Sequence, residues 1–179
     1  MSGDLSWLPP LMLFGDHGSS WKRYIDALYK VYCDAFVNNK VRFRGGLVTV
    51  RWQPPEDGRG YTFNHITTGD EPGVGRVLDF RRCERIAWLK AMLEADESKV
   101  RIWETPRGAR THVVVALPDF SFAIYLDRVA GRGTYHLLTA YHIESERKRE
   151  RMQKEWEAFE KTKTPPLRDG AGTPSTRGR

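Results

Sequence analysis

The sequence has only two cysteines, Cys33 and Cys83, and neither stands in a Cys-x-x-Cys or Cys/His spacing. This scarcity argues against a disulfide framework and against a structural zinc site, and it fits a reducing, cytoplasmic compartment. The chain also lacks an apolar run of about 18 residues, so no membrane-spanning helix is expected. The short apolar segment at 7–14 has no basic region before it and no cleavage site after it, which argues against a signal peptide.

Several motifs of known chemistry are missing as well. We find no phosphate-binding Gly-x-x-x-x-Gly-Lys-[Ser/Thr] loop, no His-Glu-x-x-His zinc motif and no Gly-x-Ser-x-Gly nucleophile motif, so the sequence predicts neither a cofactor nor a metal. The net charge of +6 is concentrated at one end, because residues 161–179 hold five basic residues and one acidic residue. We expect 163–179 to be a disordered basic tail, and charge alone does not identify a nucleic-acid-binding protein.

Residues 1–162 predict a single α+β domain, with a helical N-terminal part at about 5–40. Ser20 and Asp79 are the expected N-caps of two helices, and 69–73 is an expected loop. Hydrophobic periods and turn residues divide the chain into helices at 20–38, 79–93 and 144–161 and strands at 41–43, 47–52, 61–67, 100–104, 111–117, 120–126 and 134–143. Consecutive strands late in the chain predict an antiparallel sheet.

His65 is the first candidate for chemistry. It lies near the end of a predicted strand, beside the glycine-containing loop. Histidine titrates near neutral pH, so it serves as base or acid in phosphodiester cleavage. The alternative interpretation is a histidine that only makes a structural hydrogen bond.

Arginines at the start of the central helix are the second candidate. Arg82 belongs to the inward-facing apolar stripe of that helix, and Arg81 and Arg85 lie within one turn of it. An arginine on such a stripe must be paired or must face a polar cleft, because burying it without a partner is costly. A guanidinium is well suited to bind a phosphate. The alternative is an internal ion pair with Glu84 or Glu104.

The strand at 134–143 is the third candidate. Alternation places Leu137, Thr139 and Tyr141 on one face, where the two hydroxyls would lie about 6–7 Å apart and could orient a phosphate. Threonine and tyrosine are also common in any strand, which is the alternative explanation. His112 and His136 show no ligand spacing and receive no role.

Taken in order, several segments resemble the phage-associated barnase–EndoU–colicin–RelE-like nuclease domains. The most specific parts are the run Asp-x-Arg-Arg-Cys-Glu-Arg-Ile-x-Trp at 79–88 and the Thr-Ala-Tyr strand at 139–141, and the Phe-x-His-Ile-Thr segment at 63–67 also fits. The resemblance covers most of 5–160. It implies N-terminal helices and a central helix packed on a curved antiparallel sheet of about four strands, to which the sequence adds a charged C-terminal helix.

The resemblance also implies a function. Members are metal-independent endoribonucleases, often toxins of phages or mobile elements, so RNA and an antitoxin or immunity protein are the implied partners. Cleavage would proceed by attack of the RNA 2′-hydroxyl on the adjacent phosphorus. The implied catalytic residues are His65, Arg82, Thr139 and Tyr141, and the implied substrate-binding residues are Arg81, Arg85 and Thr67. Two alternatives stay open: a non-catalytic module that binds RNA or protein, and a phage structural or accessory protein.

Overall fold

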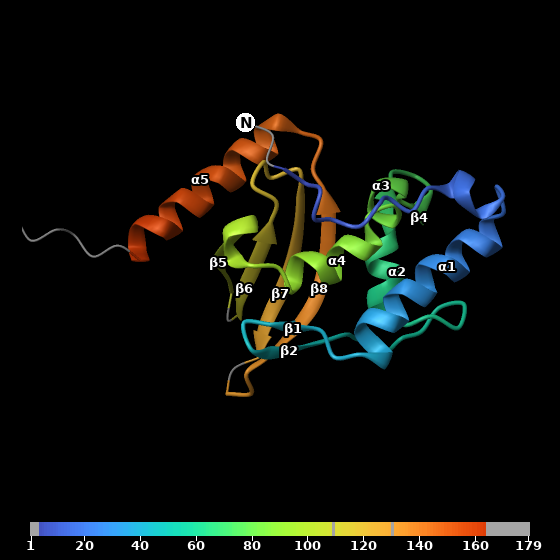
Figure 1. Cartoon of the computed structure of the whole chain (residues 1–179), viewed down its shortest axis with the longest axis horizontal. Coiled ribbons are helices and arrows are strands. Elements are labelled where there is room, and N and C mark those ends of the chain that lie inside the picture. Colours follow the sequence, from blue (N-terminus) through green and yellow to red (C-terminus); the bar gives the residue numbers. More distant parts are fainter. Residues whose placement is uncertain (1–3, 109, 130, 164–179) are drawn as a thin grey trace, which may run out of the picture.

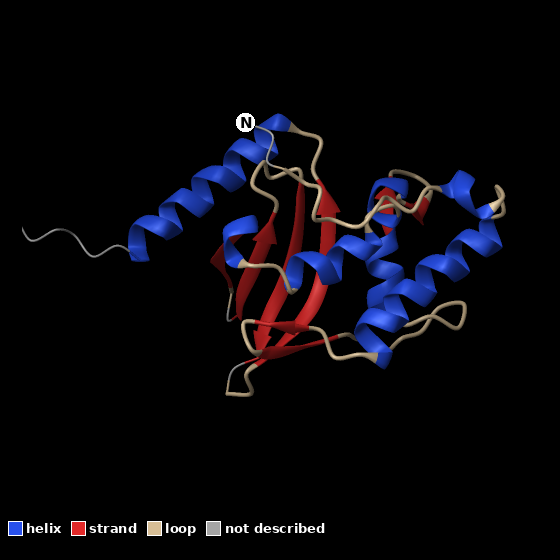
Figure 2. Ribbon diagram, viewed as in Figure 1, coloured by secondary structure: helices blue, strands red, loops and turns tan. Residues whose placement is uncertain are grey.

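A computed structural model describes residues 4–108, 110–129 and 131–163. They form a mixed α+β fold, as the sequence predicts (Figures 1 and 2). The expected tail from residue 164 onward lies outside the described residues, whereas Lys163 belongs to the last helix. No helix of the described part is both long enough and apolar enough to cross a bilayer.

The N-terminal half of the chain begins with helices. Ser20 caps the first long helix as expected, because its side chain accepts a hydrogen bond from the Arg23 backbone N–H. The elements in this half are η1 (Phe14–His17), α1 (Trp21–Cys33), the π-helical turn η2 (Asp34–Asn38), β1 (Arg42–Phe43), β2 (Gly46–Thr49), α2 (Tyr61–Thr67), β3 (Thr68–Glu71) and β4 (Gly75–Leu78).

Two predictions in this half are wrong. The segment predicted as a strand at 61–67 is the helix α2, because Phe63, Ile66 and Thr67 bury one helical face and the Thr67 hydroxyl donates to the Phe63 carbonyl at 2.8 Å. The expected loop at 69–73 is instead part of the β3–β4 hairpin, whose turn is formed by a glycine at φ +78°, Gly73.

The C-terminal half supplies most of the sheet. Asp79 caps the central helix as expected, although that helix breaks after one turn, at Arg85, whose backbone is not helical. The elements are α3 (Phe80–Cys83), α4 (Ile86–Leu93), η3 (Glu97–Lys99), β5 (Arg101–Arg107), β6 (Arg110–Ala116), β7 (Phe122–Val129), β8 (Thr134–His142) and α5 (Glu146–Lys163).

The main sheet has six strands rather than about four. Its order is β1-β2-β8-β7-β6-β5, because the early hairpin joins the sheet through a parallel pairing of Leu47 with Thr134. The sheet is therefore antiparallel except at this β2–β8 pair. In Figure 1, β2 crosses the lower end of the sheet, and α4 lies across its front.

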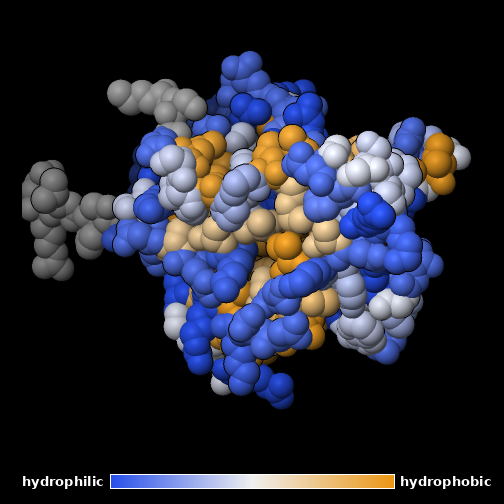
Figure 3. Space-filling view, turned by 45° about the vertical axis from the view of Figure 1, so that its right-hand side comes forward, coloured by the Kyte–Doolittle hydropathy of each residue, from blue (hydrophilic) through white to orange (hydrophobic). Residues whose placement is uncertain are grey.

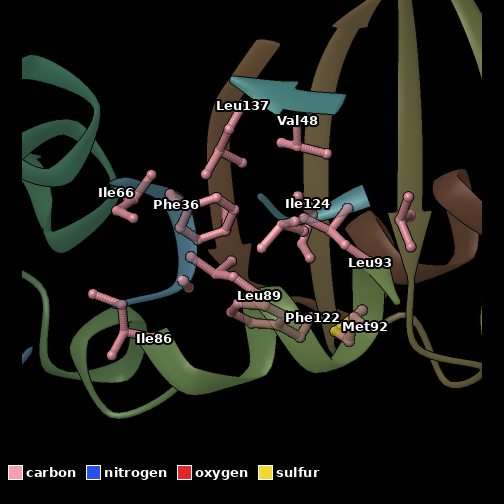
Figure 4. Close-up of a cluster of buried hydrophobic side chains, with 14 of the residues drawn as sticks. Phe36, Val48, Ile66, Ile86, Leu89, Met92, Leu93, Phe122, Ile124 and Leu137 are labelled. Carbon is pink, nitrogen blue, oxygen red and sulfur yellow. The ribbon is translucent and has the colours of Figure 1, made fainter. Parts of the chain in front are cut away.

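Side chains pack on both faces of the sheet. On one face, α4 lies over the sheet and α1 packs against α4, and Figure 4 shows Leu89 and Leu93 of α4 directed toward Ile124 and Leu137. On the other face, Met152 of α5 packs in a second cluster with Trp103 and Val114. We call these the α4 side and the α5 side. Figure 3 shows hydrophilic side chains around the rim of the molecule and apolar ones toward the middle of that view.

Strand β8 does not alternate strictly. Leu137 pairs with Leu126, but Thr139 pairs with Tyr125, so one extra residue forms a β-bulge between them. Leu137 consequently belongs to the α4-side core, whereas Tyr125 and Tyr141 border the α5-side cluster. The prediction that Leu137 shares a face with Thr139 and Tyr141 is therefore wrong, because the bulge shifts the alternation by one residue.

Candidate functional site

A cleft of about 620 Å³ opens on the molecule where α3, the end of β8 and the first turns of α5 meet. Its cationic lining comes from two distant parts of the sequence, Arg81 and Arg82 on α3 and Lys148 and Arg151 on α5. We call it the β8–α5 cleft. Asp79 and Glu144 also line the cleft and pair with Arg82 and Arg81, so four positive and two negative charges leave it cationic, and it is the strongest candidate for binding an anion.

Arg82 is held in the wall of this cleft by several contacts. Its Nε lies 2.9 Å from Asp79 Oδ2, and its Nη1 donates to the Thr68 carbonyl at 2.9 Å. The guanidinium carbon lies 4.4 Å from the centre of the Tyr141 ring, and only 15% of the side chain is exposed. Arg82 thus has both of the environments that the sequence allowed, because it is paired with Asp79 and also lines the cleft.

Arg85 has a different environment. Its Nη1 lies 3.3 Å from Glu84 Oε2 and donates to the Arg81 carbonyl at 2.9 Å, and its guanidinium carbon lies 5.1 Å from the Trp88 ring centre. Burial lowers the pKa of the Arg85 guanidinium. Arg85 therefore makes the internal ion pair with Glu84 that was the alternative interpretation, and it does not line the cleft.

The other cations of the cleft are more exposed. Arg81 is 59% exposed, and its Nε lies 3.6 Å from Glu144 Oε1. Lys148 and Arg151 are three residues apart on α5, so they lie on the same face of that helix. These three side chains remain accessible to a ligand, whereas Arg82 is already oriented by the protein.

His142 is the histidine that the structure places in the cleft, and the sequence gave it no role. Its Nδ1 is buried without a hydrogen-bond partner in the described part of the chain, and lies 3.8 Å from Glu144 Oε1. Burial, followed by the charges of Arg85 and Arg81, lowers the pKa of His142. The neutral, proton-accepting form of the ring is therefore favoured. Its position directly after Tyr141 was the sequence feature that could have suggested it.

Two tyrosines complete the cleft wall. Tyr141 and Tyr125 lie on neighbouring strands with ring centres 5.7 Å apart in an edge-to-face arrangement, and both line the cleft. Tyr141 therefore joins Arg82 as the sequence predicts, and the Arg82 guanidinium lies over its ring.

Two predicted threonines do not line the cleft. Thr139 pairs with Tyr125 on the α5 side, but it is buried, and its hydroxyl has no partner among the described residues. Thr67 is buried in α2, and its hydroxyl donates to the Phe63 carbonyl. Neither side chain lines the β8–α5 cleft.

His65 opens into a separate cavity of about 360 Å³, which it lines with Tyr61 and Arg76. Its ring stacks on Tyr61 with centres 5.6 Å apart, and its carbonyl accepts a hydrogen bond from Arg76 at 3.2 Å. Burial, followed by the charges of Arg76 and Arg82, lowers the pKa of His65. His65 thus lies within electrostatic reach of Arg82, although it faces another hollow.

Within residues 4–108, 110–129 and 131–163, no three His, Cys, Asp or Glu side chains are grouped as a metal site would need. Comparison with protein-family models, curated proteins and solved structures gave no match. The chemistry of the β8–α5 cleft itself therefore carries the functional proposal.

Proposed function

We propose that this protein is a metal-independent endoribonuclease whose β8–α5 cleft binds the phosphodiester that is cleaved. The observation that carries the proposal is the meeting of Arg82, Tyr141 and His142 in one cationic cleft. A preorganised guanidinium stabilises charge on phosphate oxygens, and a nearby neutral imidazole accepts a proton. The toxin role, the immunity partner and the cytoplasmic location implied by the sequence remain predictions.

The reaction that fits these groups is transesterification. The RNA 2′-hydroxyl loses its proton to His142 and attacks the adjacent phosphorus, and the bond from phosphorus to the 5′-oxygen breaks. The products are a 2′,3′-cyclic phosphate and a 5′-hydroxyl, which takes up a proton. Arg82 and Arg81 stabilise the charge on the non-bridging oxygens, and the Tyr141 hydroxyl orients the phosphate.

The test is cleavage of end-labelled RNA by the purified chain in the presence of a chelator, with the product ends mapped. A base contributes about 10²–10⁴-fold and a charge donor about 10²–10³-fold to the rate, so His142→Ala and Arg82→Gln should lose activity on that scale. Lys90→Gln, an exposed change on α4 outside the cleft, is the matched control and should retain full activity.

His65→Ala separates the two candidate bases. If His142 is the base, His65→Ala changes the rate far less than His142→Ala does, since His65 opens into a different cavity. Loss of cleavage in His65→Ala with full activity in His142→Ala would reverse that assignment. RNA binding without any cleavage would overturn catalysis and favour the non-catalytic module.

A further inference from the structure

A row of polar side chains crosses five adjacent strands on the α5 side, beyond the β8–α5 cleft. The strand register pairs each member with the next, and paired residues share a face of the sheet. The row lies on the face of Tyr125, because Asp127 follows Tyr125 by two residues on β7. In order across the sheet, its members are Thr105, His112, Asp127, His136 and Thr49.

The hydrogen bonds of Thr49 determine which nitrogen of His136 carries a proton. The Thr49 hydroxyl donates its single proton to the Tyr135 carbonyl at 3.1 Å, and the same oxygen is in hydrogen-bond contact with His136 Nδ1. Thr49 must therefore accept from Nδ1, so the neutral ring of His136 carries its proton there. This leaves Nε2 of an exposed side chain as a hydrogen-bond acceptor.

One arginine, Arg110, lies on the same face of the sheet as this acceptor, because it pairs with Asp127, the strand partner of His136. His136 lines a cavity of about 690 Å³ together with Asp127, Arg110 and Arg128. Arg110 Nη1 lies 3.0 Å from Asp127 Oδ2, which anchors one nitrogen of a side chain that is 72% exposed. Arg128 also lines the cavity, but it pairs with Tyr135 of the α4-side core and contacts Glu104 at 3.6 Å, so it projects to the opposite face of the sheet. The exposed guanidinium of Arg110 is suited to phosphate oxygens.

We propose that this cavity binds one ribonucleotide unit of the RNA substrate. Arg110 binds its phosphate, and His136 Nε2 accepts a hydrogen bond from the ribose 2′-hydroxyl. A fixed acceptor at this place distinguishes RNA from DNA, because deoxyribose has no 2′-donor. The inference rests on the proposed function for its substrate class.

The position of the cavity fits a subsite for the same RNA strand as the cleaved bond. Tyr141 and His136 both lie on β8, about 15 Å apart at the rise of an extended strand. Both face the α5 side, so one RNA strand lying along β8 meets the β8–α5 cleft and this cavity in succession.

The test uses probes that contain no phosphodiester and therefore are not cleaved. The full chain is titrated with adenosine 5′-monophosphate and with its 2′-deoxy counterpart, affinities of all variants are measured by isothermal titration calorimetry, and shifts of the His136 ring signals in the wild-type NMR spectrum locate the site. The ribonucleotide should bind about fivefold more tightly, which is the effect of one net hydrogen bond. His136→Leu should abolish this ratio, whereas Arg110→Gln should weaken both ligands equally. Equal affinities in the wild type, or no shift with either nucleotide, would overturn the proposal.

Thr49→Val tests the tautomer argument while it keeps His136 in place. Loss of the hydroxyl frees Nδ1, so the ring-nitrogen signals should show the proton partly moved to Nε2, and the ribose preference should fall. Thr105→Val, at the far end of the row, is the matched control and should change neither. An unaltered tautomer and preference in Thr49→Val would contradict the reasoning. Failure of the wild type to cleave RNA would refute the proposed function yet leave these nucleotide affinities interpretable.

Discussion

Arg82 and Tyr141 should be coupled energetically, and the coupling can be measured in the folded protein without any substrate. The guanidinium carbon lies 4.4 Å from the Tyr141 ring centre, while Nε and Nη1 are held by Asp79 and by the Thr68 carbonyl. The side chain therefore has one fixed orientation. The perturbation is Arg82→Met, which keeps an unbranched apolar chain and removes the charge.

The structure sets the size of the effect. The ion pair with Asp79 is partly exposed, at 15% and 30% for the two side chains, so it contributes about 1 kcal/mol rather than the larger cost of breaking a buried pair. The charged hydrogen bond to the Thr68 carbonyl contributes about 1.5–3 kcal/mol, and the contact with the Tyr141 ring about 1 kcal/mol. We expect Arg82→Met to lower the free energy of unfolding by about 3–5 kcal/mol.

A double-mutant cycle isolates the ring contact. The free energy of unfolding in urea is measured for the wild type, Arg82→Met, Tyr141→Leu and the double variant. Because only the cation–ring contact is lost in both single variants, the coupling should be about 1 kcal/mol. The control cycle pairs Arg82→Met with Tyr135→Leu, at the other end of β8, and should be additive within about 0.3–0.5 kcal/mol.

Additivity in the first cycle would refute this reasoning. Arg82 would then be held by Asp79 and Thr68 alone, and the Tyr141 ring would not fix the plane of the guanidinium. The proposed catalysis depends on that orientation, because a preorganised donor contributes more than one that must reorganise during the reaction. The cycle therefore tests a premise of the mechanism independently of activity.

Three further predictions follow from packing and charge. The pKa values of His65 and His142 are lowered in the folded state, so the unfolded state takes up protons first as the pH falls. The free energy of unfolding should therefore decrease as the pH drops below about 6.5. Urea titrations at several pH values check this, and His142→Leu should make the free energy of unfolding less dependent on pH. Gly46→Ala would bring a Cβ within 2.4 Å of a backbone oxygen and should cost about 1–3 kcal/mol by thermal unfolding, whereas Gly15→Ala meets nothing within 4 Å. Met152→Ala removes the buried side chain of α5 and should cost about 2–5 kcal/mol, and the loosened helix should weaken RNA binding in an anisotropy assay.

The sequence predicts strands β5 to β8 and the charged last helix well, because runs of β-branched and aromatic residues, and the 3.6-residue spacing of the apolar residues of α5, persist over seven residues or more. The sequence-based prediction is wrong at 61–67, where threonine and aromatic residues have a high strand propensity. The helix forms because Phe63 and Ile66, three residues apart, both reach the core. A segment of seven residues contains too few helical turns for this periodicity to outweigh the strand propensity.

The cleft is predictable only in part. Arg82 can be recognised locally, because it lies on an apolar helical stripe where a guanidinium needs a partner or a polar cleft. Lys148 and Arg151 come from a helix more than 60 residues later, so their approach to Arg82 depends on how α5 packs on the sheet. Tertiary packing of this kind leaves no periodic pattern in the sequence.

The bulge in β8 also explains why the two proposed binding regions lie on one face. His136 and Tyr141 are five residues apart, and strict alternation would direct them to opposite faces of the sheet. The extra residue between Leu137 and Thr139 shifts the alternation by one, so His136 and Tyr141 both face the α5 side. Without that residue, His136 would point toward the α4-side core, where an imidazole without a partner is costly to bury. The bulge that made the sequence-based face assignment wrong is thus the feature that would let one strand of the proposed RNA substrate contact both regions.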